Sequence, residues 1–151
     1  MKSVPTSDRL VAKRSHVHGW GLFLNKVPVA RNDMIVEYMG ESVRGVVADL
    51  RERLYEEQAV GSCYLFRLDR TGIVDATKKG GMARFINHSC LPNAYAKVVQ
   101  LENGVKKIVF FALRDLSIGE EVKRVNHVTN CPSIGLSLAF FSEYVSSSGF
   151  L

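Results

Sequence analysis

The sequence predicts a β-rich α+β fold made of short strands, with one helix in the middle of the chain. Short runs of β-branched and aromatic residues alternate with turn residues along most of its length, which is typical of strands. Only residues 42–58 repeat their apolar side chains at helical spacing. Because further helices do not separate the strands, a parallel βαβ arrangement is not expected.

Length and composition limit the class of protein. At 151 residues the chain has the size of one domain, and its 46% hydrophobic content allows a core. The net charge is +5, but basic residues are interleaved with acidic ones, so no direct nucleic-acid binding is expected. The N-terminus lacks the apolar core of a signal peptide, and no run reaches the ~18 to 20 apolar residues of a membrane span. The chain is therefore expected to be soluble and intracellular, with no membrane partner.

The N-terminal part predicts a lead-in followed by a glycine-rich turn. Residues 1–13 have the composition of an irregular lead-in. Gly19 and Gly21 flank Trp20, so the backbone there can turn sharply and approach a ligand closely. A plain turn explains the same pattern. Residues 22–24 then predict a short buried strand.

The next segment predicts a strand and the helix. Residues 34–39 are β-branched and aromatic, as in a strand. In the helix of residues 42–58, five apolar side chains fall on one face, which is expected to pack in the core: Val43, Val46, Val47, Leu50 and Leu54.

The second half predicts mainly strands. Residues 63–69 alternate as in a half-buried strand, and residues 73–75 follow after a turn. Residues 94–101 and 105–113 form the clearest hairpin. Between them, Asn103–Gly104 is the dipeptide that a two-residue type I′ turn prefers.

One stretch, residues 81–94, concentrates chemistry-bearing side chains. The apolar run 82–86 is followed directly by Asn87 and His88, whose amide and imidazole can hydrogen-bond a flat polar ligand such as adenine or an amino-acid head group. A structural turn set by Pro92–Asn93 explains the stretch without a ligand. It also matches a glycosylation acceptor pattern, which the absence of a secretory segment disfavours.

Residues 84–93 resemble the signature of the SET-domain protein-lysine methyltransferases. With its companion segments, the resemblance covers residues 14–122. Further segments, in the family's order, narrow it to the trithorax-related, histone H3 lysine-4 branch. The matching segments are residues 18–23, 37–41, 64–69, 74–77, 84–93 and 119–121.

The resemblance implies the SET-domain fold, with small sheets and a knot-like Asn-His loop. It implies methyl transfer from S-adenosyl-L-methionine to a lysine of histone H3, and a chromatin regulator in the nucleus. The implied partners are the histone H3 N-terminal tail and COMPASS-type core subunits.

The resemblance also implies roles for individual residues. Tyr38 and Tyr64 are expected at the catalytic lysine channel; the alternative for Tyr38 is a core tyrosine in a strand. The residues expected to bind the cofactor are His18, Gly19, Trp20, Gly21, Tyr64, Arg84, Asn87 and His88.

The chain departs from the family after Val122. The family continues with two tyrosines, the first of which carries the principal catalytic hydroxyl, but here Arg124 and Asn126 occupy those positions. Tyr144 is too far along the chain to replace either. An arginine stays charged and would repel a sulfonium. A catalytically impaired SET remnant, which binds cofactor, histone tail or partners without turnover, is therefore the alternative function.

The tail, residues 123–151, also lacks the family's zinc motif. In the family, three downstream cysteines and the cysteine that matches Cys90 hold one zinc ion. Here Cys131 is the single downstream cysteine, so no zinc is expected. The change at residue 123 resembles an alternative or mis-spliced C-terminus.

Overall fold

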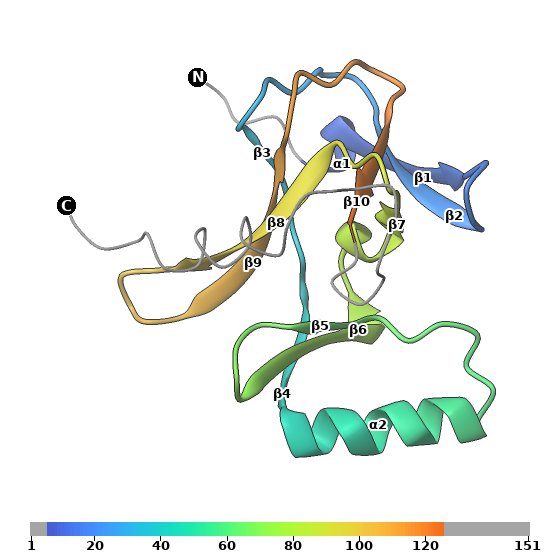
Figure 1. Ribbon diagram of the computed structural model, residues 1–151, viewed down its shortest axis with the longest axis vertical. Coiled ribbons are helices and arrows are strands. Elements are labelled where there is room, and N and C mark those ends of the chain that lie inside the picture. Colours follow the sequence, from blue (N-terminus) through green and yellow to red (C-terminus); the bar gives the residue numbers. More distant parts are fainter. Residues whose placement is uncertain (1–5, 126–151) are drawn as a thin grey trace.

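Two sheets and one long helix make up the fold, and the computed structural model describes residues 6–125 (Figure 1). The predictions made for Asn126, Cys131 and Tyr144 concern residues outside this range. The elements of the larger sheet and the helix before it are α1 (Thr6–Arg9), β1 (Leu10–Arg14), β2 (Trp20–Leu24), β3 (Met34–Glu37), β7 (Asn87–His88), β8 (Ala94–Gln100), β9 (Lys106–Ala112) and β10 (Glu121–Arg124). The remaining elements are β4 (Gly40–Arg44), α2 (Gly45–Glu57), β5 (Leu65–Arg67), β6 (Gly72–Gly80) and the 3₁₀ helix η1 (Met82–Phe85).

The larger sheet is organised around β10, the last described strand. The strand order is β1-β2-β10-β8-β9-β3, and β7 also pairs with β10. β10 runs antiparallel to β2 but parallel to β7 and β8. A late strand is therefore inserted between earlier ones, and it brings the start of β2 close to β7.

The smaller sheet, in the order β4-β6-β5, carries α2 on one side (Figure 1). The buried carboxylate of Asp75 joins the two. It accepts hydrogen bonds from Arg51 (2.8 Å), from the Tyr55 hydroxyl (2.8 Å) and from the Thr77 amide (2.9 Å). Burial acts to raise the pKa of Asp75, but these hydrogen bonds outweigh it, so the pKa lies below its usual value.

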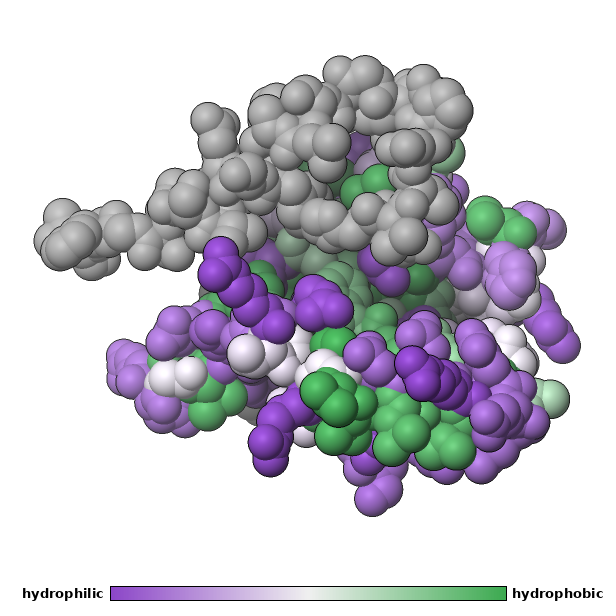
Figure 2. Space-filling view, turned by 60° about the horizontal axis from the view of Figure 1, so that its bottom comes forward, coloured by the Kyte–Doolittle hydropathy of each residue, from purple (hydrophilic) through white to green (hydrophobic). Residues whose placement is uncertain are grey.

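The predicted helix is present, but the prediction of its buried face was wrong. The residues of α2 that pack inward are Ala48 and Tyr55, with Arg51 between them reaching Asp75. Val43 lies in β4, and the other four apolar residues are exposed, at 83% for Val46, 41% for Val47, 58% for Leu50 and 40% for Leu54. Figure 2 shows hydrophobic side chains gathered on the lower face, where α2 lies. The sheet binds α2 through a charged network, which turns the apolar stripe outward.

The predicted hairpin is confirmed, but its turn type was wrong. β8 and β9 pair from Ala94↔Ala112 to Gln100↔Lys106. A type I′ turn needs positive φ at both central residues, yet Asn103 is not among the positive-φ residues of the described chain, whereas Gly104 has φ 79°. The Gly104 amide donates to the Leu101 carbonyl (2.8 Å), and the Leu101 amide donates to the Val105 carbonyl (2.8 Å). The loop is therefore a three-residue turn that ends in a left-handed glycine.

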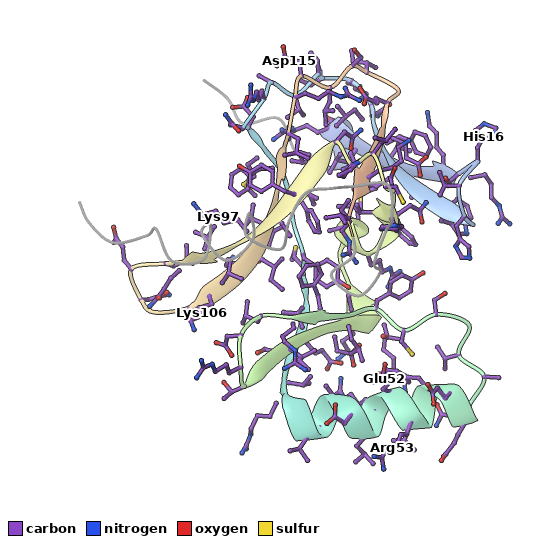
Figure 3. All side chains as sticks on the ribbon, in the orientation of Figure 1. His16, Glu52, Arg53, Lys97, Lys106 and Asp115 are labelled. Atoms are coloured by element: carbon purple, nitrogen blue, oxygen red, sulfur yellow. The ribbon has the colours of Figure 1, made fainter. Side chains whose placement is uncertain are left out.

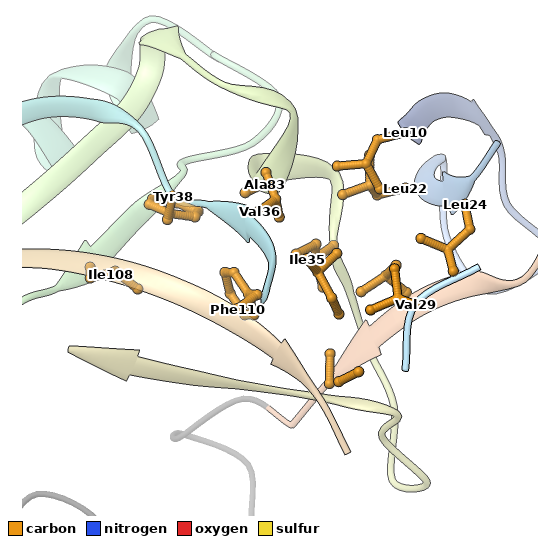
Figure 4. Close-up of a cluster of buried hydrophobic side chains, with 14 of the residues drawn as sticks. Leu10, Leu22, Leu24, Val29, Ile35, Val36, Tyr38, Ala83, Ile108 and Phe110 are labelled. Carbon is orange, nitrogen blue, oxygen red and sulfur yellow. The ribbon is translucent and has the colours of Figure 1, made fainter. Parts of the chain in front are cut away.

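The core lies between the larger sheet and η1 (Figure 4). Phe110 and Leu22 are fully buried, and Ala83 of η1 is packed in the same cluster. An ion pair also joins the two sheets, because Lys106 of β9 (labelled in Figure 3) reaches the carboxylate of Asp69 at 2.8 Å. Short strands in small sheets with one middle helix confirm the predicted fold class.

Replacing Asp75 with Asn should destabilise the fold by about 3 kcal/mol, because removing one partner of a buried charged network leaves the others uncompensated. Chemical denaturation at pH 7 measures this. Glu41 also contacts Arg51 (3.0 Å) but is partly exposed, so Glu41→Gln is the control and should cost about 1 kcal/mol or less. Equal losses in the two variants would contradict the role assigned to Asp75.

The same network makes the stability of the fold depend on pH. The pKa of Asp75 is lower in the folded chain than in the unfolded one, so its contribution is complete above the ordinary aspartate pKa of about 3.9. The contribution of Asp75 to stability is lost as the pH falls from the ordinary aspartate pKa to below the lower pKa that Asp75 has in the folded chain. Denaturation between about pH 5 and pH 2 should show a smaller loss of stability for Asp75→Asn than for the wild type.

Candidate functional site

The Asn87 side chain connects two segments that are distant in the sequence. Its amide nitrogen lies within hydrogen-bonding distance of the His18 carbonyl (3.2 Å), the Trp20 carbonyl (3.0 Å) and the Glu121 carboxylate (2.9 Å). Asn87 belongs to β7, the Trp20 segment leads into β2, and Glu121 begins β10. One amide therefore holds the glycine-rich turn against the central strand.

The glycines of this turn meet two different requirements. Gly19 has φ 47°, a left-handed conformation that other residues rarely adopt. Gly21 has no such angle, but a Cβ there would collide with the carboxylate of Glu121 and lie 3.0 Å from the Phe23 ring. Gly21 therefore leaves room for Glu121 to reach Asn87.

A cavity of about 310 Å³ opens beside this turn. Six of the predicted cofactor residues line it, namely His18, Gly19, Trp20, Tyr64, Arg84 and Asn87. The other lining residues were not predicted as site residues, namely Ser62, Cys63, Phe85, Ile86 and Arg124. A second hollow, of about 490 Å³, lies at the tip of the β8–β9 hairpin and contains none of the predicted residues.

Two predicted cofactor residues, Gly21 and His88, do not line the cavity. Gly21 is buried beneath the turn, where it makes room for Glu121. His88 follows Asn87 in β7, and its Nε2 atom lies 3.8 Å from the sulfur of Cys90. The structure therefore places His88 beside the cavity wall, and its role in binding stays a prediction.

Tyr38 lies behind the wall of the cavity. Its side chain is buried, and its hydroxyl donates a hydrogen bond to the carbonyl of Tyr64 (3.0 Å), which itself lines the cavity. The Tyr38 ring contacts those of Phe66 (5.1 Å between centroids) and Phe110 (6.4 Å). Burial in this aromatic cluster raises the pKa of Tyr38 to about 12, so the phenol is neutral at physiological pH.

Arg84 lines the cavity, and one donor of its side chain is buried without a partner in the described part of the chain. Its guanidinium makes one long hydrogen bond, to the Ala76 carbonyl (3.3 Å), and lies against the rings of Phe85 (4.9 Å) and Tyr64 (5.9 Å). Its buried Nε atom has no hydrogen-bond partner among the residues that the structure describes. A buried donor without a partner is costly to the folded state.

Asn93 was predicted only as a turn residue, but it fixes the position of β10. Its buried amide donates to the Glu120 carboxylate and to the Glu121 carbonyl, both at 2.8 Å. Its side-chain oxygen accepts from the Lys123 amide (2.7 Å). The Pro-Asn pattern indicated a turn, whereas nothing in the sequence indicated this long-range contact.

The described residues contain no evident metal centre or membrane-spanning helix. Within residues 6–125, no three His, Cys, Asp or Glu side chains come together as a metal site would require. Because Cys131 lies outside that range, the absence of zinc stays a prediction. None of the helices in the same range is long and apolar enough to cross a bilayer.

Comparison with known proteins identifies the family. The SET-domain family model matches residues 19–123, which include the cavity lining from Gly19 to Asn87 and nearly all of β10. This chain belongs to the SET-domain family. The match ends one residue before Arg124.

Named relatives of this SET domain are histone-lysine methyltransferases. The chain is 50% identical over 109 residues to the human histone-lysine N-methyltransferase SETD1B. It is 53% identical over 109 residues to an H3 lysine-4 specific enzyme of Emericella nidulans, and over 110 residues to one of Chaetomium globosum. Each match covers 72% of this chain but only 5 to 10% of the relative. The resemblance to the histone H3 lysine-4 branch is confirmed.

Replacing Gly21 with Ala should displace the Glu121 carboxylate and break its hydrogen bond with Asn87, at a cost of about 1 kcal/mol, the net value of one such bond. Thermal unfolding measures the loss. Gly45 begins α2, and no neighbouring atom lies within 4 Å of the position that a Cβ would occupy there, so Gly45→Ala should leave the stability unchanged or slightly raised. Unaltered stability in Gly21→Ala would contradict the close packing described.

Proposed function

We propose that this SET domain transfers a methyl group from S-adenosyl-L-methionine to lysine 4 of histone H3. The proposal rests mainly on one observation: Trp20 and Asn87 line the same cavity, and the Asn87 amide donates a hydrogen bond to the Trp20 carbonyl. The names of the relatives supply the substrate, since two are H3 lysine-4 specific enzymes. The chain would thereby act on chromatin in the nucleus.

The residues of the cavity fit this cofactor. The guanidinium of Arg84, a lining residue of the cavity, suits the carboxylate of an amino-acid head group. The exposed backbone around Gly19 and the half-exposed Trp20 ring (50%) suit the adenosyl part. Arg84, Asn87 and the turn at residues 18–20 would hold the cofactor, which supplies the methyl group as an electrophilic sulfonium when bound.

The protein's own groups would prepare the lysine. An amine must lose its proton to act as a nucleophile, and apolar surroundings lower its pKa. Tyr38, Phe66 and Tyr64 form an aromatic wall next to the cavity, and the Tyr38 phenol stays neutral. We therefore assign Tyr38 and Tyr64 to the lysine channel, where they would orient the amine for transfer.

A second candidate function is binding without turnover. Arg124 lines the cavity. By the family resemblance, it stands where the family carries its principal catalytic tyrosine. A guanidinium cannot take the part of a phenol, because it has no acceptor and keeps its charge. A domain that holds cofactor, histone tail or partners, and transfers methyl groups slowly or not at all, is consistent with this replacement.

Partner proteins are also part of the proposal. The exposed apolar stripe of α2, formed by Val46, Val47, Leu50 and Leu54, offers a surface on which COMPASS-type core subunits would pack. The histone H3 tail would instead bind at the cavity, with its lysine directed toward Tyr64.

A transfer assay with radiolabelled S-adenosyl-L-methionine separates the two functions. The wild-type chain should label an H3 tail peptide, but not a peptide with arginine at position 4. Arg124→Tyr restores the family's phenol and should raise the rate by about 10²-fold or more, as general acid–base groups do. Asn87→Ala should abolish labelling in both backgrounds.

The outcome for Arg124→Tyr decides between the candidates. Transfer by the wild type and the variant supports the enzyme. Cofactor binding without transfer in the wild type, together with transfer by Arg124→Tyr, supports the impaired domain. If neither protein transfers a methyl group or binds the cofactor while both remain folded, the proposed function is wrong.

A further inference from the structure

Arg124 is one of the residues that line the cavity, and its guanidinium lies over the ring of Phe66, 5.0 Å from the ring centroid. Among residues 6–125, no side chain or carbonyl makes a hydrogen bond or ion pair with this guanidinium, and burial lowers the pKa of Arg124. An arginine nevertheless remains protonated at neutral pH, so the cavity carries a poorly hydrated positive charge.

The other charges of the cavity add to this one. Arg84 brings a second guanidinium to the same lining, which contains no aspartate or glutamate from the described part of the chain. The Glu121 carboxylate lies behind Asn87 and accepts a hydrogen bond from its amide (2.9 Å). Tyr38, which lies behind the wall, is neutral because its pKa is raised to about 12. The cavity is therefore electropositive and disfavours a bound cation.

We propose that Arg124 makes the cavity select uncharged adenosyl thioethers over the corresponding sulfonium ions, so that the demethylated product binds more tightly than the methyl donor. The inference rests on the proposed function. S-adenosylhomocysteine and S-adenosylmethionine share their adenosine, carboxylate and amine, and differ by one methyl group and one positive charge. Any difference in their affinities that depends on Arg124 therefore reports on the charge.

This selection has a consequence for turnover. Two unit charges several ångströms apart in a partly desolvated site repel each other strongly enough to change affinity by about tenfold or more. The carboxylate that both ligands share still gains from Arg84, so the cavity need not lose affinity for adenosyl ligands in general. The domain would retain the thioether after each transfer and would be held in the product-bound state.

Isothermal titration calorimetry of the whole chain with each ligand tests the inference. The wild type should bind S-adenosylhomocysteine at least about tenfold more tightly than S-adenosylmethionine, a difference of about 1.4 kcal/mol. Arg124→Gln should reduce this ratio about tenfold, whereas Arg124→Lys, which keeps the charge, should preserve most of it. Arg67 is exposed and outside the cavity, so Arg67→Gln is the matched control and should leave the ratio unchanged.

The outcomes separate this inference from the proposed function. If both ligands bind and the ratio is the same in the wild type and in Arg124→Gln, the inference is overturned while the proposed function survives. A ratio that falls equally in Arg67→Gln would also overturn it. If neither ligand binds to the folded wild type or to folded Arg124→Gln, the cavity is not a cofactor site and both proposals are wrong.

Discussion

The contact between the Asn87 amide and the glycine-rich turn determines where every other part of the site lies. The amide reaches the His18 and Trp20 carbonyls and the Glu121 carboxylate, and so joins β7 to the turn and to the central strand. Gly21 permits the contact because a larger residue would occupy the space of Glu121. The cavity exists because these segments meet there.

The central strand β10 provides the other half of this arrangement. Asn93 fixes its backbone through hydrogen bonds to Glu121 and Lys123, and the strand pairs with β2, β7 and β8. These contacts position the strand whose last residue, Arg124, lines the cavity. This explains how the scaffold of a SET domain can be retained while an arginine replaces the expected tyrosine, and it places the functional consequence in the charge of the cavity.

Local patterns predicted the strands, the middle helix and the β8–β9 hairpin, because each depends on the spacing of neighbouring residues. The buried face of α2 could not be predicted in the same way. Apolar spacing identified one face, but Arg51 reaches the buried Asp75, and the neighbouring face with Ala48 and Tyr55 packs inward instead. The turn at Gly104 also differed, since Asn103 does not adopt positive φ. The members of the cavity came from the family resemblance, whereas the bridging roles of Asn87 and Asn93 depend on contacts between distant segments.

A crystal structure of the chain with S-adenosylhomocysteine tests the central claim most directly. We predict ligand density in the cavity between Trp20, Asn87 and Arg84, with the Asn87 amide still bound to the Trp20 carbonyl and Arg124 beside the thioether. Ligand density elsewhere on the molecule, or a bound state in which Asn87 and Trp20 have separated, would contradict it.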